Sequence, residues 1–216
     1  MRKDLTIVSG IMLVMAGIFL LGHLGVDPNI LRGATFLIGP LILVFLTRHF
    51  RRSAPEVPWA CHVAAASGLF WGATTLIGGV GHSVAVASLA SRVPEYGPLQ
   101  VLWFTTGAML VYTGAMNAVL YRAIKAGRCW AIAIAAATSL LFVAYMLFVN
   151  PLPGSGGTLP VMIAIWSLNL LLLGIAGIAA MRWARTRHAS GNETATPFFT
   201  TAYLEATELT KATKNV

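Results

Sequence analysis

The chain contains one long run without any Asp, Glu, Lys or Arg, which extends from Cys129 to Met181. A membrane-spanning helix needs about 20 mostly apolar residues, because the hydrocarbon core is about 30 Å thick and each residue rises about 1.5 Å. The run is therefore long enough for two such helices. A stretch rich in Pro and Gly, residues 150–157, interrupts it and predicts a turn between them.

The composition agrees with a membrane protein. Hydrophobic residues make up 57% of the 216 residues and charged residues only 10%, and the mean hydropathy is +0.76. Soluble domains carry about 25% charged residues, so a soluble globular fold is excluded, and the apolar content excludes a disordered chain. Apolar runs such as the four leucines 170–173 are continuous, whereas a transmembrane β-barrel needs alternation.

The gaps between charges predict an all-α integral membrane protein with six transmembrane helices. In lipid a helix satisfies all of its backbone polar groups internally. We expect three helical hairpins in one transmembrane domain, residues 1–188, followed by a polar cytoplasmic C-terminal tail, residues 189–216. The first helix is longer than the apolar part of a signal peptide. The predicted helices cover residues 5–25, 30–47, 58–81, 98–122, 129–149 and 159–182.

The basic residues predict the orientation of the chain. Six spans put both termini on one side, and if that side is the cytoplasm, all but two of the 15 Lys and Arg residues lie inside. The exceptions are Arg32 and Arg92. Since Lys and Arg resist translocation, we expect both termini in the cytoplasm and a location in a bacterial-type inner (plasma) membrane. The net charge of +8 therefore reflects topology, and we expect no nucleic-acid partner.

Ionisable groups are missing from the predicted membrane interior. All seven Asp and Glu residues lie outside the predicted helices. Ion-coupled pumps place an ionisable group at membrane depth, so a carboxylate-based proton-coupled transporter is disfavoured. The paired Asp residues of intramembrane aspartyl proteases are absent, and Cys61 and Cys129 do not form a Cys-x-x-Cys motif. We therefore favour a non-enzymatic function and assign no catalytic residue.

Two amide side chains, Asn117 and Asn169, fall within predicted helices. An amide in hydrocarbon must find a partner or water. Two interpretations stay open. The amides can form hydrogen bonds between helices, each worth about 0.6–2 kcal/mol. Alternatively, they line a polar pathway for a small neutral solute, with Tyr112 and Thr113 as further polar groups.

Small residues on two predicted helices favour close packing. Gly68 and Gly72 form a Gly-x-x-x-Gly pair in the third helix, and Gly174 and Gly177 lie in the sixth. Such surfaces let helices approach closely, either within one chain or between the subunits of a homo-oligomer.

Four histidines lie at two depths near the ends of predicted helices. His23 and His82 are at outer ends, and His49 and His62 are at inner ends. Two b-type haems would need such pairs, with one His from each of two helices. Histidine also suits the headgroup boundary, because its ring is apolar and its edge polar. Our main expectation is therefore no cofactor, with haem b as an alternative. We expect no other metal site, because no carboxylate or thiolate clusters with these residues.

Three hypotheses of function follow. The first is a permeation or transport protein in the lipid bilayer for a small solute. The second is a non-catalytic accessory subunit of a larger membrane complex. It would dock on a membrane-protein partner through aromatic side chains of the tail, Phe198, Phe199 and Tyr203. The third is a b-type haem electron carrier. The sequence leaves the first two level and names neither solute nor partner.

Overall fold

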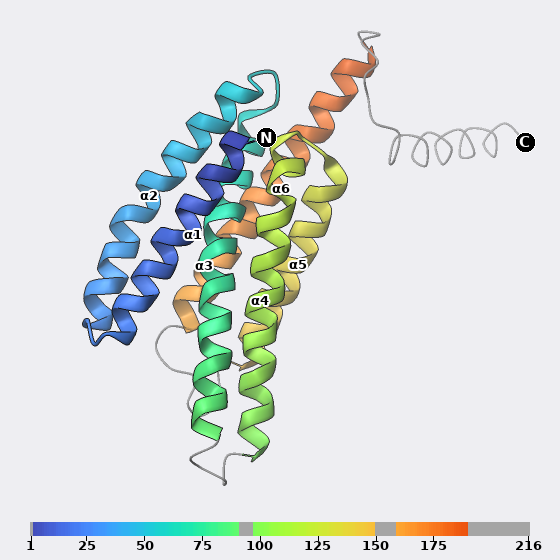
Figure 1. Ribbon diagram of the computed structural model, residues 1–216. Coiled ribbons are helices and arrows are strands. Elements are labelled where there is room, and N and C mark those ends of the chain that lie inside the picture. Colours follow the sequence, from blue (N-terminus) through green and yellow to red (C-terminus); the bar gives the residue numbers. More distant parts are fainter. Residues whose placement is uncertain (1, 91–96, 150–158, 190–216) are drawn as a thin grey trace, which may run out of the picture.

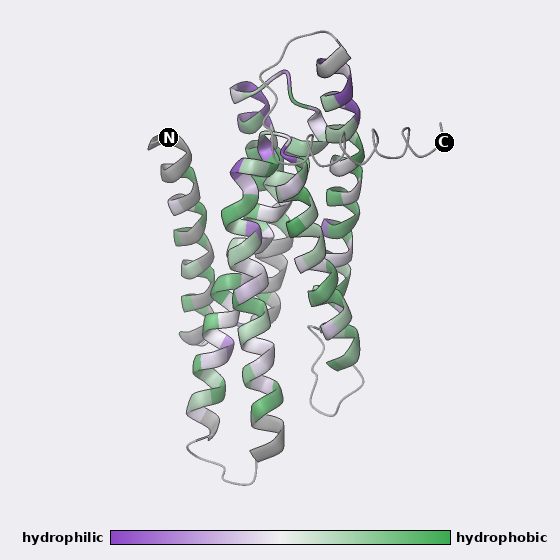
Figure 2. Ribbon diagram, turned by 90° about the vertical axis from the view of Figure 1, so that its right-hand side faces the viewer, coloured by the Kyte–Doolittle hydropathy of each residue, from purple (hydrophilic) through white to green (hydrophobic). Residues whose placement is uncertain are grey.

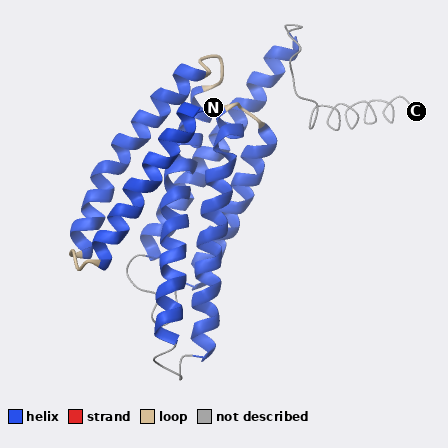
Figure 3. Cartoon of the chain, viewed as in Figure 1, coloured by secondary structure: helices blue, strands red, loops and turns tan. Residues whose placement is uncertain are grey.

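The computed structural model describes residues 2–90, 97–149 and 159–189, which form six helices (Figures 1 and 3). No strand occurs within these ranges, so the predicted all-α fold is confirmed. The helices are α1 (Arg2–His23), α2 (Pro28–Ser53), α3 (Trp59–Ala90), α4 (Gly97–Lys125), α5 (Cys129–Val149) and α6 (Leu159–Ala189).

Several helices are longer than the sequence predicts. The bounds of α5 agree with the prediction, but α2 continues to Ser53, α3 to Ala90 and α6 to Ala189. Charged residues ended the predicted spans of α2 and α6, yet they do not end a helix where their side chains reach water. The predicted end of α3 at residue 81 instead lay well before the next charged residue, Arg92. The charge gaps therefore locate the apolar parts of α2 and α6 and underestimate the total length of these two helices.

Among the described residues, three helices are long and apolar enough to cross a membrane: Trp59–Ser88, Cys129–Val149 and Leu159–Arg187, with 30, 21 and 29 residues. Helix α4 is of similar length, with 29 residues, but it is not one of these three. The structure thus confirms an all-helical chain and identifies three helices that can cross a membrane. A crossing by all six helices stays a prediction.

Four helices form a closed ring. Helix α3 packs against α4, α4 against α5, α5 against α6, and α6 against α3. Helices α1 and α2 lie side by side outside this ring and pack against α3 (Figure 1). Helix α3 is therefore the central element, because it contacts four of the other five helices.

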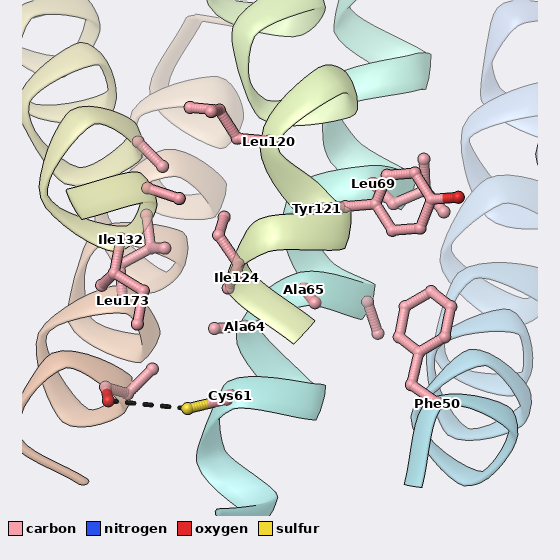
Figure 4. Packing of buried hydrophobic residues seen from close by; sticks show 14 of the residues in the cluster. Phe50, Cys61, Ala64, Ala65, Leu69, Leu120, Tyr121, Ile124, Ile132 and Leu173 are labelled. Carbon is pink, nitrogen blue, oxygen red and sulfur yellow. Dashed lines mark hydrogen bonds between the residues drawn. The ribbon is translucent and has the colours of Figure 1, made fainter. Parts of the chain in front are cut away.

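The buried face of α3 is built from small side chains. Cys61, Ala64 and Ala65 are fully buried and face larger residues of the neighbouring helices, among them Ile124 of α4 and Leu173 of α6 (Figure 4). The Cys61 thiol donates to the backbone oxygen of Ala176 at 3.7 Å. Small residues on the central helix let its neighbours approach closely, which is how helices associate in lipid.

Polar and apolar surfaces are separated along the bundle. The most hydrophilic residues gather at one end, and the sides of the helices are mostly apolar (Figure 2). Basic residues occupy the last turns of α2 and α4, including Arg51, Arg52, Arg122 and Lys125. Large apolar side chains such as Leu37 and Val119, which are 75% and 74% exposed, point away from the bundle. This distribution fits a protein whose sides face lipid.

A glycine sets the turn between α4 and α5. Gly127 has a φ of +71°, a conformation that favours glycine. Its amide donates to the oxygen of Ile124 at 2.9 Å, and the Arg128 amide donates to the oxygen of Ala123 at 3.0 Å. These two bonds form a Schellman motif, which ends α4 and starts the antiparallel return of α5.

Glycines also bring α3 and α4 together. A Cβ atom built on Gly72 would lie 2.8 Å from the backbone oxygen of Gly114. A Cβ on Gly114 would lie 2.5 Å from the backbone nitrogen of Leu76, and one on Gly107 would overlap Ser83 Oγ. The two backbones are therefore in direct contact at Gly72 and Gly114, where only glycine fits, whereas Gly107 faces the Ser83 side chain.

We expect Gly114→Ala to destabilise the fold by about 1–3 kcal/mol, because the added methyl group meets backbone atoms that cannot move independently. The matched control is Gly78→Ala on α3, where an added Cβ meets nothing within 4 Å. Thermal unfolding in detergent measures both variants. Equal unfolding midpoints for the two would show that the α3–α4 contact does not limit stability.

Candidate functional site

Four buried polar side chains meet inside the helical ring, and each helix contributes one of them. Ser67 of α3 is 3% exposed, and the other three are completely buried. The set consists of Ser67, Asn117, Ser139 and Asn169, and we call it the polar cluster. Its members lie far apart in the sequence, so the cluster links all four helices of the ring.

Asn169 is the centre of the polar cluster. The Ser67 hydroxyl donates to Asn169 Oδ1 at 2.9 Å. Asn169 Nδ2 in turn donates to Asn117 Oδ1 and to Ser139 Oγ, both at 3.4 Å. The first distance is typical of a good hydrogen bond, whereas the other two are at the long end of the range and therefore weaker.

Backbone oxygens satisfy the remaining donors of the cluster. Asn117 Nδ2 donates to the backbone oxygen of Thr113 at 3.1 Å, and Ser139 Oγ donates to that of Ala135 at 2.8 Å. Both acceptors lie four residues earlier on the same helix. These local bonds orient Asn117 and Ser139 so that their oxygens can accept from Asn169.

Glycines of α3 make room for Asn117. An added Cβ on Gly68 would lie 3.5 Å from Asn117 Oδ1, and one on Gly72 would lie 3.2 Å from Asn117 Cβ. The predicted Gly-x-x-x-Gly pair therefore packs within the chain, against α4. Because these two glycines have no side chains, the Asn117 amide can reach the centre of the ring.

The other predicted polar residues separate into two groups. Thr113 is completely buried one turn from Asn117, and its Oγ1 has no hydrogen-bond partner within the described part of the chain. Tyr112 is 48% exposed and points away from the ring. Thr113 can therefore belong to an internal site, and Tyr112 cannot.

The packing glycines of α6 do not behave like those of α3. Gly174 is exposed, and an added Cβ there meets nothing within 4 Å. A Cβ on Gly177 would make an ordinary contact with Ile132 at 3.6 Å. The expectation of close packing at Gly174 within this chain is wrong, because its side of α6 faces outward. Packing there between subunits stays a prediction.

Two of the four histidines have a ring nitrogen bound to the backbone. His62 Nε2 lies 3.0 Å from the oxygen of Ala54, and His82 Nε2 lies 3.1 Å from the oxygen of Trp103. Since a carbonyl oxygen only accepts, both Nε2 atoms donate. His49 stacks on Phe45 with ring centroids 6.4 Å apart.

Haem binding stays a prediction for all four histidines. The α1 helix ends at His23, whose side chain lies outside the described side chains. In the described conformation, His62 and His82 would have to release their backbone bonds before Nε2 could bind iron. Among the described residues, no three His, Cys, Asp or Glu side chains gather as a metal site would require.

The tail residues proposed for docking, Phe198, Phe199 and Tyr203, lie outside the described residues. Comparison of the chain with family models, with curated proteins and with solved structures finds no match. The function must therefore be argued from the polar cluster and its surroundings.

The chemistry of the polar cluster is neutral. Amide and hydroxyl groups donate and accept hydrogen bonds, but they do not gain or lose a proton, and so stay uncharged, at ordinary pH. No charged residue lies between Cys129 and Met181, which includes both Ser139 and Asn169. The site can hold helices together or bind a neutral hydrogen-bonding molecule, and it lacks the groups for acid–base chemistry.

We expect Asn169→Leu to lower the free energy of unfolding by about 2 kcal/mol, because three interhelical hydrogen bonds of about 0.6 kcal/mol each are lost. Thr138→Val is the matched control. The Thr138 hydroxyl is also buried, but it donates only to its own helix, at Ile134. Thermal unfolding in detergent compares the two, and equal midpoints would contradict a stabilising role for the cluster.

Proposed function

We infer that α1, α2 and α4 cross the membrane together with α3, α5 and α6. These three helices have 22, 26 and 29 residues, and each exceeds the length of about 20 that a span requires. Basic residues gather at the end of the bundle where α2, α4 and α6 finish (Figures 1 and 2). The positive-inside rule assigns this end to the cytoplasm of a bacterial-type cell.

Cysteine labelling tests this topology. On a background without Cys61 and Cys129, Asp27→Cys marks the α1–α2 turn and Ser53→Cys marks the end of α2, and both residues are exposed. In intact cells a membrane-impermeant maleimide should label Asp27→Cys alone, and Ser53→Cys should react only after permeabilisation. If α2 does not cross the membrane, both positions will react alike.

We propose that the ring of α3, α4, α5 and α6 conducts a small neutral solute through the membrane, with Asn117 and Asn169 at the narrow polar point. The observation that carries this proposal is the polar cluster itself, in which each helix of the ring supplies one buried polar side chain. A solute crossing the ring would find hydrogen-bond donors and acceptors there. Elsewhere it would meet mostly apolar walls.

The weak bonds of the cluster support passage. Both bonds from Asn169 Nδ2 are 3.4 Å long, so neither contributes more than about 0.6 kcal/mol. A solute that accepts from Asn169 and donates to Asn117 can replace them at small cost. An ion cannot do so equally well, because a buried charge needs a counter-charge or several strong ligands.

Two glycine variants test the pathway without disturbing the fold. Gly68→Ala adds a methyl group beside the Asn117 amide at an ordinary contact distance of 3.5 Å. Gly78→Ala adds the same group on the same helix where nothing lies within 4 Å. We expect only Gly68→Ala to reduce permeation of urea, glycerol or water into proteoliposomes, measured by stopped-flow light scattering.

Replacing the amides gives the larger effect. Asn117→Leu and Asn169→Leu should each lower permeation about tenfold, because the solute then crosses this point without a hydrogen bond. Monodisperse elution and a measured unfolding midpoint show that each variant is folded. If the wild-type protein raises permeation of none of these solutes above protein-free liposomes, or both Leu variants conduct normally, the pathway is refuted.

The accessory-subunit hypothesis remains a separate proposal. It depends on Phe198, Phe199 and Tyr203, and deletion of residues 196–216 should then release a partner in a pull-down from native membranes. The haem-carrier hypothesis depends on the four histidines. Their positions near helix ends support it, but the described contacts of His49, His62 and His82 add no support.

A further inference from the structure

Two buried polar atoms near the polar cluster are without a hydrogen-bond partner. They are Thr113 Oγ1 on α4 and Trp166 Nε1 on α6, and within the described part of the chain neither has a partner. Both residues are completely buried. A polar group left unpaired in an apolar interior costs about 1–3 kcal/mol, so two such atoms call for a ligand.

The two atoms lie at the same level of the ring. Thr113 precedes Asn117 by four residues, and Trp166 precedes Asn169 by three, so each lies about one helical turn from the bonded amide pair. Both α4 and α6 run away from the end where α3 finishes and α4 begins (Figure 1). Thr113 and Trp166 are therefore displaced in the same direction from the cluster.

The packing around Trp166 places α4 next to it. Trp166 packs edge-on against Phe142 of α5, with ring centroids 5.4 Å apart. Met109 of α4 packs on the same group of residues. Thr113 lies on one stripe of α4 between Met109, which contacts the Trp166 group, and Asn117, which contacts Asn169. Its side chain therefore faces the same interior.

Thr113 differs from three other threonines in the described helices. Thr74, Thr106 and Thr138 each donate to the backbone oxygen four residues earlier, at 2.8–2.9 Å. The corresponding bond is not formed by Thr113, so its hydroxyl is available to another group. Threonine commonly uses this local acceptor when nothing else competes.

We propose that Thr113 Oγ1 and Trp166 Nε1 form a binding site for one small neutral molecule, of the size of water, beside the polar cluster. The indole N–H only donates, so the ligand must offer a lone pair. The hydroxyl can donate or accept, so the ligand needs no particular second group. A protonated amine lacks the lone pair and is excluded, whereas water or ammonia meets the requirement.

If the proposed permeation pathway exists, this site is one of its subsites, and that role rests on the proposed function. Whether a molecule occupies the site does not depend on permeation. In a pathway, a molecule held here would lie one turn from the Asn117–Asn169 pair and could pass to it by exchanging hydrogen bonds. In a closed bundle, the same molecule would be a structural water that satisfies two orphaned groups.

Nuclear magnetic resonance of the indole groups tests occupancy with water as the probe. The full chain has six Trp residues, and Trp166→Phe assigns the Trp166 indole N–H signal in ¹⁵N-labelled protein in detergent. We expect a nuclear Overhauser cross-peak between this N–H and water. Its sign distinguishes it from a cross-peak that arises from chemical exchange of the proton. Thr113→Val should abolish the cross-peak, and Thr113→Ser, which keeps the hydroxyl, should retain it.

The control is Thr138→Val, whose hydroxyl bonds within α5 and should leave the cross-peak unchanged. Unchanged signals from the other five indoles show that a variant is folded. The proposal is overturned if the wild-type Trp166 N–H has no cross-peak to water, or if Thr113→Val leaves it intact. A cross-peak in a protein that conducts no solute would support the site and refute the pathway.

Discussion

The backbone contact between α3 and α4 is the constraint on which the interior of this protein depends. At Gly72 and Gly114 the two helices approach so closely that a single added Cβ atom would lie 2.5–2.8 Å from backbone atoms of the partner helix. In lipid, where burial of apolar surface gives helices little reason to associate, such close packing is a main source of stability. The contact also determines how far Asn117 reaches into the ring, because its amide lies beside Gly68 and its Cβ atom lies beside Gly72.

The polar cluster follows from that contact. With Asn117 held against α3, its oxygen can accept from Asn169 of α6, and Asn169 can also reach Ser67 and Ser139. Because the cluster joins four helices through one side chain, its loss removes several cross-links together. Helix association and the chemistry of the interior thus depend on the same few residues, so stability and permeation must be measured side by side on each variant.

Much of the fold could be predicted from the distribution of charge. The gaps between charged residues identify all six helices that the structure describes, and the bounds of α5 agree with the prediction. The same criterion could not find where α2 and α6 end, since it measures apolar length and not helix length. The charge-free run that contains α3 extends to Ser91, so the predicted end of that helix at residue 81 was too early for another reason. The close contact of α3 with α4 could be predicted only in part, from the spacing of glycines in the sequence. The Gly68–Gly72 pair marks the contact face of α3, whereas Gly107 and Gly114 on α4 are seven residues apart and form no Gly-x-x-x-Gly pair.

The polar cluster could be predicted in part, from the cost of placing polar side chains in hydrocarbon. Asn117 and Asn169 stand out because amides are costly in hydrocarbon. Ser67 and Ser139 do not stand out, because a hydroxyl in a helix can bond to its own backbone, as that of Ser139 does, and so needs no partner elsewhere. Tyr112 is half exposed although its neighbour Thr113 is completely buried, since adjacent residues of a helix point about 100° apart. Only the packing of four helices decides which polar side chains converge.

The unpaired atoms of Thr113 and Trp166 distinguish two interpretations of the interior, a polar core that only holds helices together and one that also binds a molecule. A cluster that served only to hold helices together would be complete once each donor and acceptor was paired, and Ser67, Ser139 and the two amides come close to this. The next turn departs from it, because two buried polar groups there remain unpaired in the described part of the chain. Apolar residues at both positions would have given a more stable dry core. Polar groups at this level are therefore better explained by a molecule that binds between them than by the needs of packing.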